Sequence, residues 1–288
     1  MKAIISLGMI CLFLSACATN AEETASETKE EAKEEANQEE HQKEEEQQEQ
    51  EKESEQEQKE KQTDENDKQS SEDEKQEAEE LYEVNANDSS LQALKDGVDE
   101  QKVLITIDDA PDTYSVEMAE YLAEADVPAI FFVNGHFLKD DEGKENLKKI
   151  HDMGFEIGNH TMTHSDVTEL SKEELENEIL GLNELVKDII GEEPTFFRAP
   201  FGMNSEESKA LLEEQDMVWM NWTYGYDWES EYQNAEALAD IMVQTELLRS
   251  GANLLMHDRE WTNQALPDII EGFREKEYGF INPDNIKQ

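Results

Sequence analysis

The chain has 288 residues, with 73 Asp and Glu against 24 Lys and Arg, and its formal net charge is −49. This excess of acid excludes a nucleic-acid-binding protein that works by neutralising phosphates, because such proteins need a basic face. The charge is unevenly spread: residues 21–80 have a net charge of −19 and no Gly, Pro, Cys, Phe, Trp or Tyr, whereas residues 81–288 have a net charge of −31 and contain every Trp and Tyr. The two stretches therefore need separate interpretations.

The first 17 residues have the pattern of a secretion signal. Lys2 precedes an apolar run over residues 3–14, which has the length of a signal-peptide core and is too short to span a bilayer. The sequence Leu14-Ser15-Ala16-Cys17 resembles the lipobox of bacterial lipoproteins, which implies cleavage before Cys17 and lipidation of its sulfur. The alternative is a secreted protein in which Cys17 is incidental. Because Cys11 would leave with the signal, the folded part has no thiol for a disulfide.

Residues 18–88 are predicted to be a spacer without a packed core. They are dominated by Glu, Gln and Lys, whose burial cannot offset the entropy of ordering the chain. Two conformations remain open: an extended chain favoured by like-charge repulsion, or a helix supported by pairs such as Glu39–Lys43 and Glu55–Lys59. No apolar heptad repeat is present, which argues against a coiled coil. In either conformation the segment would tether the folded domain to the membrane.

Residues 89–288 are predicted to form one domain, since about 200 residues are ample for a single core. Strands are expected at residues 103–107, 128–133, 155–158, 195–197, 217–222, 253–256 and 279–281. Helices are expected at residues 115–125, 145–153, 171–190, 206–214, 235–248 and 267–275. The helix over 171–190 begins with a capping box of Ser171 and Glu174 and ends at Gly191. This alternation predicts an α/β fold with a parallel sheet, either open or closed into a barrel.

Active residues are expected just beyond the C-terminal ends of the strands in both arrangements. Five polar clusters occupy such positions: Asp108-Asp109, His160 to His164, Arg198 to Gly202, Asp227-Trp228 and His257-Asp258. We therefore expect these clusters to lie together at one end of the sheet or barrel, the mouth formed by the C-terminal ends of the strands.

His160 and His164 are expected to bind a divalent metal ion together with one carboxylate. Two imidazoles and one carboxylate oxygen form a facial set of three ligands, which leaves positions open for water and substrate. This ligand set suits Zn²⁺, with Co²⁺, Ni²⁺ and Fe²⁺ as alternatives.

Two charged pairs are also expected at the mouth. Arg198 follows Phe197 and is expected to be buried, so it needs a carboxylate partner, for which Asp108 and Asp109 are the candidates. Asp227 can orient His257 and raise its pKa, which would make His257 a general acid.

Together these motifs resemble the NodB-homology polysaccharide deacetylases, carbohydrate esterase family four. The resemblance covers residues 103–281, and its five motifs are Thr106 to Pro111, His160 to His164, Arg198 to Gly202, Asp227-Trp228 and Leu255 to His257. It implies a deformed (β/α) barrel of about seven units and metal-dependent removal of N- or O-acetyl groups. In that family pattern Asp108 would be the general base, positioned by Arg198, while Asp109, His160 and His164 would hold the metal.

The remaining roles concern the leaving group and the acetyl group. The resemblance implies that His257, tuned by Asp227, protonates the leaving amine, and that Trp228 and Leu255 wall the pocket for the acetyl methyl. A tetrahedral oxyanion also needs a backbone donor, for which the N–H of Phe201 is the candidate.

The combined prediction is a monomeric, membrane-tethered deacetylase of N-acetylated cell-envelope polysaccharide, with peptidoglycan amino sugars as the expected substrate. The alternatives are a glycan-binding lipoprotein with the same fold and little or no activity, or an esterase for O-acetylated polysaccharide. The first alternative is motivated by Ala110, which replaces a Gly of the family motif and would be strained if its φ were positive, and by Ala199, which replaces a Pro. His136 follows the second strand and is interpreted as a loop residue; His41 and His151 are given no role.

Overall fold

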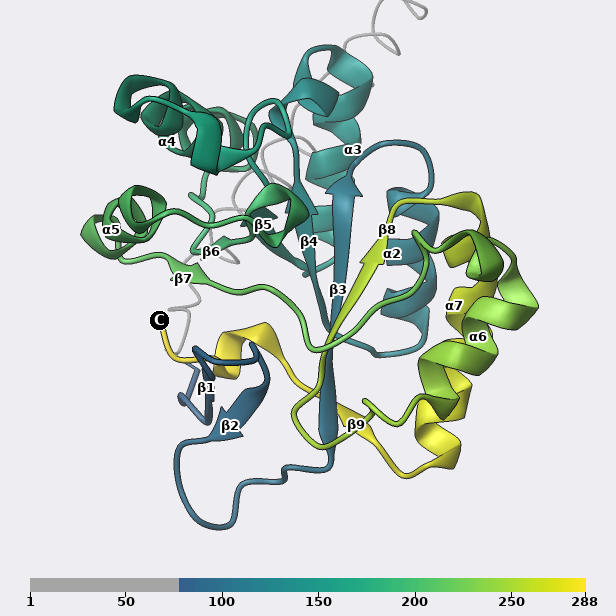
Figure 1. Cartoon of the computed structure of the whole chain (residues 1–288). Helices are drawn as coiled ribbons and strands as arrows, with labels where there is room; N and C mark the ends of the chain where they lie inside the picture. The colour runs from purple at the N-terminus through teal and green to yellow at the C-terminus, as the bar shows by residue number, and fades with distance from the viewer. Residues whose placement is uncertain (1–77) are drawn as a thin grey trace, which may run out of the picture. The chain divides into compact units, whose positions relative to one another are not determined.

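The computed structural model describes residues 78–288, which fold around one curled parallel sheet (Figure 1). The sheet has the strand order β7-β6-β5-β4-β3-β8, and β9 pairs with β3. Its strands are β3 (Lys102–Ala110), β4 (Ala129–Val133), β5 (Glu156–Asn159), β6 (Phe196–Phe197), β7 (Val218–Trp219), β8 (Asn253–His257) and β9 (Gly279–Phe280). The predictions for the signal, for Cys17 and for residues 18–77 of the spacer lie outside the described residues.

The sheet curls until the chain after β7 reaches the opposite edge strand. Tyr224 forms a parallel bridge with Leu254 of β8, and the N–H of Leu255 donates to the carbonyl of Tyr224 at 2.9 Å. All strand pairs of the curled sheet are parallel. The predicted α/β fold, a deformed (β/α) barrel, is therefore confirmed.

Six α-helices pack around this sheet. They are α2 (Ser115–Glu124), α3 (Asp141–Asp152), α4 (Lys172–Ile190), α5 (Glu206–Glu214), α6 (Ala235–Gln244) and α7 (Glu260–Glu275). Short 3-10 helices lie at η1 (Gly135–Leu138), η2 (Val167–Glu169), η3 (Pro200–Gly202), η4 (Ser230–Tyr232) and η5 (Pro283–Asn285). The predicted capping box of Ser171 and Glu174 is present, and Gly191 ends α4 with a φ of 88°. Among the helices of residues 78–288, none has the length and apolarity needed to cross a membrane.

The predicted start of the last helix at Pro267 is wrong, because α7 begins at Glu260 and contains Pro267. Proline cannot donate an N–H inside a helix, so it usually marks a first turn. Here the helix is held by a buried stripe that starts before the proline, at Thr262, Ala265 and Leu266. Tertiary burial of this face outweighs the cost of the proline.

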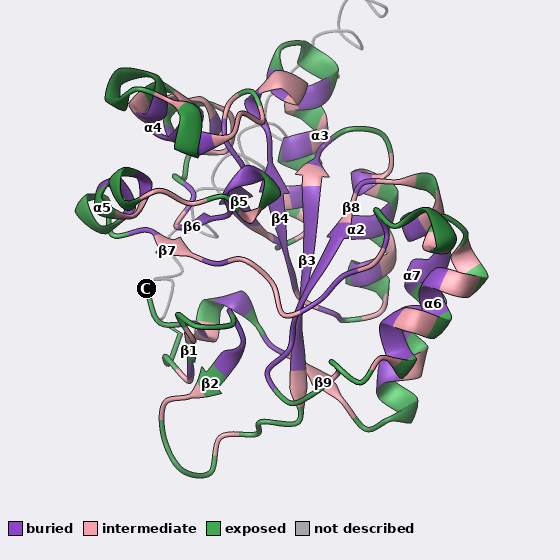
Figure 2. Cartoon of the chain, viewed as in Figure 1, coloured by how far each residue is buried: buried purple, intermediate pink, exposed green. Residues whose placement is uncertain are grey.

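Alternating side chains of the central strands separate two cores. Ile105 and Ile107 of β3 belong to the larger core, which packs against helices, whereas Leu104 belongs to a second core together with Ile130 and Phe132 of β4. This alternation is the period of two that a strand requires, and both faces of β3 are buried (Figure 2). Thr106 and Asp108 follow Leu104 on the same face, so the second core turns polar toward the C-terminal ends of the strands.

A small hairpin packs against this second core and was not predicted. Strands β1 (Tyr82–Val84) and β2 (Leu91–Ala93) pair antiparallel, and Tyr82 and Leu91 are buried in the second core. The N–H of Leu91 donates to the carbonyl of Gly251 at 2.7 Å. The folded unit therefore begins before Ser89, and a spacer that runs through residue 88 is too long at its C-terminal end. The hairpin strands are too short for a periodic pattern, and they follow directly on the acidic run.

Candidate active site

A cavity of about 490 Å³ opens at the C-terminal ends of the barrel strands. Nine of the predicted site residues line it: Asp108, Asp109, His160, His164, Phe201, Asp227, Trp228, Leu255 and His257. Arg198 lies behind them with its side chain fully buried. The expected convergence on one mouth is therefore what the structure shows.

Asp108 and Asp109 reach the same cavity because β3 is irregular at its end. Neighbouring residues of a regular strand point to opposite faces. The register with β4 shifts between Ile107 and Ala110, and Asp109 has a φ of 61°, in the left-handed region that Asp tolerates better than most residues. Ala110 is buried and does not have a positive φ, so the strain expected from its missing glycine does not arise.

The loop that carries both histidines is held from two sides. The side-chain amide of Asn159 donates to Asn183 Oδ1 of α4 at 2.7 Å, and its Oδ1 accepts the N–H of Thr161 at 2.8 Å. Asn134, after β4, donates to the carbonyl of His160. Thr161 and His164 have φ values of 71° and 62°. Backbone strain of this kind persists only where surrounding contacts impose it. Such strained residues are common at functional sites.

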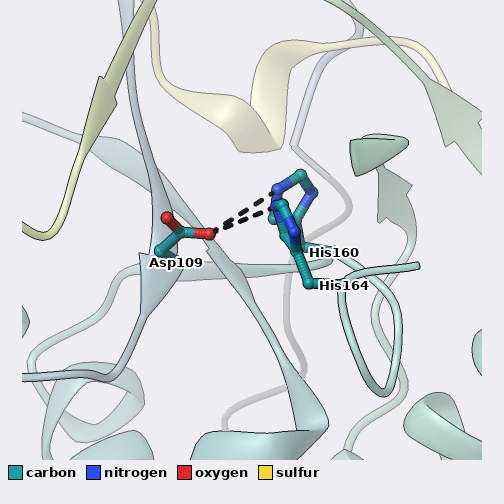
Figure 3. A group of neighbouring side chains, drawn as sticks. All are labelled: Asp109, His160 and His164. Atoms are coloured by element: carbon teal, nitrogen blue, oxygen red, sulfur yellow. Dashed lines mark ion pairs between the residues drawn. The ribbon is translucent and has the colours of Figure 1, made fainter. Parts of the chain in front are cut away.

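Asp109, His160 and His164 form a compact group of ligand atoms (Figure 3). One oxygen of Asp109, Oδ1, lies 3.9 Å from His160 Nε2 and 3.6 Å from His164 Nε2. The three ligand atoms all lie within 4.8 Å of one another. Atoms at such separations can share one cation at ordinary bond lengths of about 2.0–2.2 Å.

The hydrogen bonding of His160 fits a metal ligand. Its Nδ1 lies 2.7 Å from the backbone carbonyl of Arg198, which can only accept, so Nδ1 must carry the proton. Nε2 is then left with its lone pair toward Asp109. A second partner that fixes the tautomer in this way is typical of metal-binding histidines.

The protonation equilibria also favour neutral histidines beside a charged carboxylate. Burial lowers the pKa of His160 and outweighs the opposite effect of Asp108. Burial and the neighbouring His160 lower the pKa of His164. Burial works to raise the pKa of Asp109, but neighbouring cationic groups, His257 and Arg259 among them, outweigh it, and that pKa lies below its ordinary value. Neutral imidazole and ionised carboxylate are the forms that bind metals.

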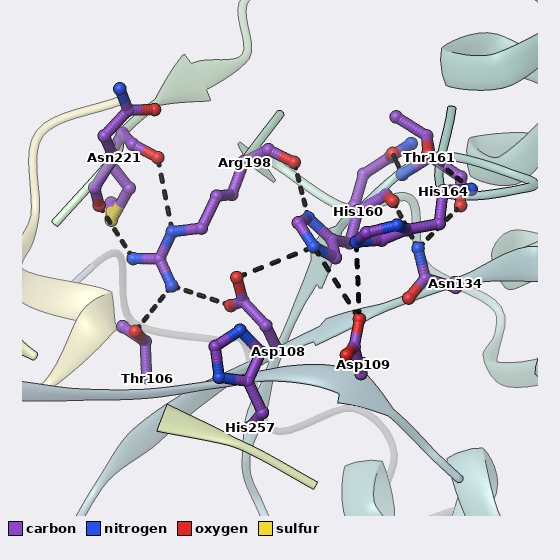
Figure 4. A network of polar contacts seen from close by, with 12 residues as sticks. Thr106, Asp108, Asp109, Asn134, His160, Thr161, His164, Arg198, Asn221 and His257 are labelled. Carbon is purple, nitrogen blue, oxygen red and sulfur yellow. Dashed lines mark hydrogen bonds and ion pairs between the residues drawn. The ribbon is translucent and has the colours of Figure 1, made fainter. Parts of the chain in front are cut away.

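Arg198 organises the groups behind the cavity (Figure 4). It forms a 2.7 Å ion pair with Asp108 Oδ1, so the choice left open between Asp108 and Asp109 falls on Asp108. Its guanidinium also donates to Thr106 Oγ1 at 2.6 Å, the carbonyl of Asn221 at 2.8 Å and Asn253 Oδ1 at 3.2 Å. The second oxygen of Asp108 remains free to face the cavity, 3.6 Å from His160 Nε2.

His257 and Asp227 form the other expected pair. Asp227 Oδ1 lies 2.7 Å from His257 Nδ1, and Oδ2 accepts from the His257 N–H at 2.6 Å and from Thr262 Oγ1 at 2.8 Å. Burial works to lower the pKa of His257, but Asp227 outweighs it and the pKa is raised. On the sheet, His257 is the register partner of Asp108, so an imidazole and a carboxylate lie on neighbouring strands.

Four residues of the cavity were not predicted: Trp222, Gln233, Arg259 and Trp261. Arg259 pairs with Asp109, its Nη2 lying 2.7 Å from Asp109 Oδ2. The sequence does contain a feature that points to Arg259: the chain has only four arginines, and this one follows the predicted site residue His257 by two residues. His136 and His151 are not among the residues that line this cavity in the described part of the chain.

Comparisons with known proteins identify relatives of the folded part of the chain. The family profile "Polysaccharide deacetylase" matches residues 95–220. A peptidoglycan-N-acetylglucosamine deacetylase of Bacillus cereus is 30% identical over 193 residues, which cover 64% of this chain and 70% of the relative. A chitooligosaccharide deacetylase of Rhizobium leguminosarum bv. phaseoli is 32% identical over 166 residues, covering 57% and 70%. The solved structure of the peptidoglycan deacetylase PdaC from Bacillus subtilis superposes with a TM-score of 0.57 at 26% identity, covering 65% and 90%.

The curled parallel barrel and these relatives place the chain in a class of hydrolases. The chain belongs to the polysaccharide deacetylase family, and it is an enzyme of that kind.

Replacing Arg198 with Met should lower the free energy of unfolding by about 3–5 kcal/mol, because Asp108 would remain buried without its partner. The matched control is Arg249→Met, which removes an exposed ion pair with Asp88 and should cost at most about 1 kcal/mol. Urea unfolding of the two variants measures the difference. Equal losses for both would show that the Arg198 network does not stabilise the barrel.

Proposed function

We propose that this protein is a metal-dependent deacetylase that hydrolyses N-acetyl groups of N-acetylglucosamine-containing cell-envelope polysaccharide, with peptidoglycan as the expected substrate. The observation that carries the proposal is the juxtaposition, in one cavity, of the Asp109–His160–His164 group with Asp108 and His257. The relatives named as peptidoglycan and chitooligosaccharide deacetylases support the substrate class.

The three ligand residues would hold a divalent cation, for which Zn²⁺ suits two histidines and one carboxylate. Co²⁺, Ni²⁺ and Fe²⁺ are the alternatives. A bound cation supplies Lewis acidity, which polarises a carbonyl and acidifies water.

Asp108 would act as the general base. Its Oδ1 is occupied by Arg198, which orients the carboxylate, and its Oδ2 faces the cavity and can take a proton from water. The backbone N–H of Phe201 would stabilise the oxyanion formed at the acetyl carbon. Phe201 has a φ of 60°, unusual for a bulky residue, at the point where the chain after β6 lines the cavity.

His257 would protonate the leaving amine, which departs only as a neutral group. The Asp227 carboxylate keeps His257 in its charged form to a higher pH and fixes its ring orientation. Trp228 packs edge-on against His257, with ring centroids 5.7 Å apart, and together with Leu255 would wall the pocket for the acetyl methyl.

The N-terminal segments would set the location of this chemistry. Residues 1–17 are proposed as a lipoprotein signal with Cys17 as the lipidated residue, and the acidic segment before the hairpin as a tether. A chain anchored in this way acts outside the cytoplasm, facing the cell wall. We propose that the enzyme works as a monomer.

Acetate release from peptidoglycan and chitin oligosaccharides tests the proposed activity. Release should require a divalent metal, stop with chelator and return with Zn²⁺. Asp108→Asn should lower kcat by at least about 100-fold because a general base is lost, whereas His151→Ala should be unchanged. Acetate release that persists in the double variant Asp109→Ala, His160→Ala would refute the metal assignment, and release from O-acetylated xylan alone would refute the substrate.

Asp227→Asn should move the descending limb of the kcat/KM profile to lower pH and lower the maximal rate. The raised pKa of His257 keeps the imidazolium present as pH rises, and removal of the Asp227 charge removes the cause of that rise. The pH profiles of the wild type and the variant, each loaded with the same metal, measure the shift. If the limb stays in place, the group that it reports is not His257.

Cys17→Ser should release the protein from the membrane fraction and abolish incorporation of labelled fatty acid. Cys11→Ser is the matched control, because Cys11 lies inside the proposed signal and would be removed with it. Fractionation of cells that express each variant measures the effect. Membrane retention of Cys17→Ser would contradict the lipid anchor.

A further inference from the structure

Arg259 lies at the cavity and contacts the one proposed metal ligand that is a carboxylate. It occupies the N-cap position of α7, just beyond the end of β8, and lines the cavity. Its Nη2 lies 2.7 Å from Asp109 Oδ2, while the other oxygen, Oδ1, is the one nearest both histidines. The two oxygens of Asp109 are thus divided between an arginine and the histidine group.

The guanidinium is itself held in place. Its Nη1 donates to the backbone carbonyl of Asp258 at 2.8 Å. The carboxylate of Asp258 is buried and accepts the N–H groups of Thr113 at 3.0 Å, Tyr114 at 2.6 Å and Ser115 at 2.9 Å. Thr113 and Tyr114 end the loop between β3 and α2, and Ser115 is the first residue of α2. The N–H of Asp258 donates to the carbonyl of Asp108, near the end of β3, at 3.0 Å. Asp258 therefore ties both ends of this loop to the strand end that carries Arg259.

We propose that Arg259 is a positioning residue that keeps Asp109 Oδ2 engaged, so that Asp109 offers the cation only Oδ1. The inference rests on the proposed metal-dependent function. A carboxylate free to turn about its Cβ–Cγ bond can present one oxygen, the other or both. The charge-assisted hydrogen bond from Arg259 selects one of these orientations.

The positive charge of Arg259 acts in the opposite direction, because it repels a cation. Two features make positioning the larger effect. The Arg259 side chain is 37% exposed, so solvent screens its repulsion, and Asp112 Oδ2 lies 4.0 Å from its Nη1 and offsets part of its charge. By contrast, loss of a hydrogen-bond partner of a metal ligand lowers metal affinity about 10–100-fold.

The test is Zn²⁺ affinity, measured on the full chain by competition with a chromophoric chelator and therefore independent of turnover. Arg259→Ala should bind Zn²⁺ about 10–100-fold more weakly than the wild type. Arg259→Lys, which keeps the charge but not the planar fork, should recover only part of that loss. Arg249→Ala removes an arginine that pairs with Asp88 outside the cavity and should bind like the wild type. Thermal unfolding of each metal-free variant checks that the fold is retained.

A second readout reports the geometry of the site. Visible absorption of the Co²⁺-loaded protein depends on coordination number, so Arg259→Ala should change the band intensity if Asp109 gains freedom to bind through both oxygens. Unchanged or tighter Zn²⁺ binding in Arg259→Ala, with an unchanged Co²⁺ spectrum, would overturn the positioning role and leave the proposed function standing. A folded wild-type protein that binds neither metal would overturn the proposed function, and this inference with it.

Discussion

The arrangement of the strand ends depends on one buried positive charge, the guanidinium of Arg198. Moving a guanidinium from water into a protein interior costs several kcal/mol unless its charge and its N–H groups are all matched. Arg198 meets this requirement with Asp108 and Thr106 on β3, Asn253 on β8 and the carbonyl of Asn221 after β7, and it stacks 4.3 Å from the ring centre of Phe132 on β4. Its own carbonyl fixes His160 after β5. The strand ends therefore cannot shift relative to one another without leaving this charge unpaired.

Three carboxylates at the cavity each have a different cationic partner. Asp108 pairs with Arg198, Asp109 with Arg259 and Asp227 with His257, each at 2.7 Å. Because the partners differ, the environments differ: a fully buried arginine, a partly exposed arginine and a histidine that can give up its proton. This division allows three chemically identical side chains to act as base, ligand and orienting group in one proposed mechanism. It also explains how a domain with a large excess of acidic residues can place three carboxylates at one cavity, since each has its own cationic partner.

Much of this arrangement could be predicted from the sequence because the barrel strands are short apolar runs that end in polar residues. The sequence locates within a few residues the strands that contain Asp108 and His257 and those that directly precede His160 and Arg198, and their alternation with helices indicates the parallel fold. Two kinds of feature escaped. The β1–β2 hairpin forms because Tyr82 is buried in the second core, although the acidic sequence just before it predicts no folded structure. The start of α7 is likewise set by burial of one helix face, although Pro267 predicts that the helix begins there. The Arg259–Asp109 pair joins residues 150 positions apart, and nothing local indicates which oxygen of Asp109 is occupied.

Asp109, His160 and His164 are proposed to bind one divalent cation beside Asp108 and His257. Anomalous diffraction from a crystal of the Zn²⁺-loaded protein, recorded above and below the zinc absorption edge, tests it most directly. A single strong peak is expected in contact with Asp109 Oδ1 and the Nε2 atoms of His160 and His164, with Asp109 Oδ2 still hydrogen-bonded to Arg259. A peak elsewhere, or no peak at a site whose side chains are well ordered, would contradict it.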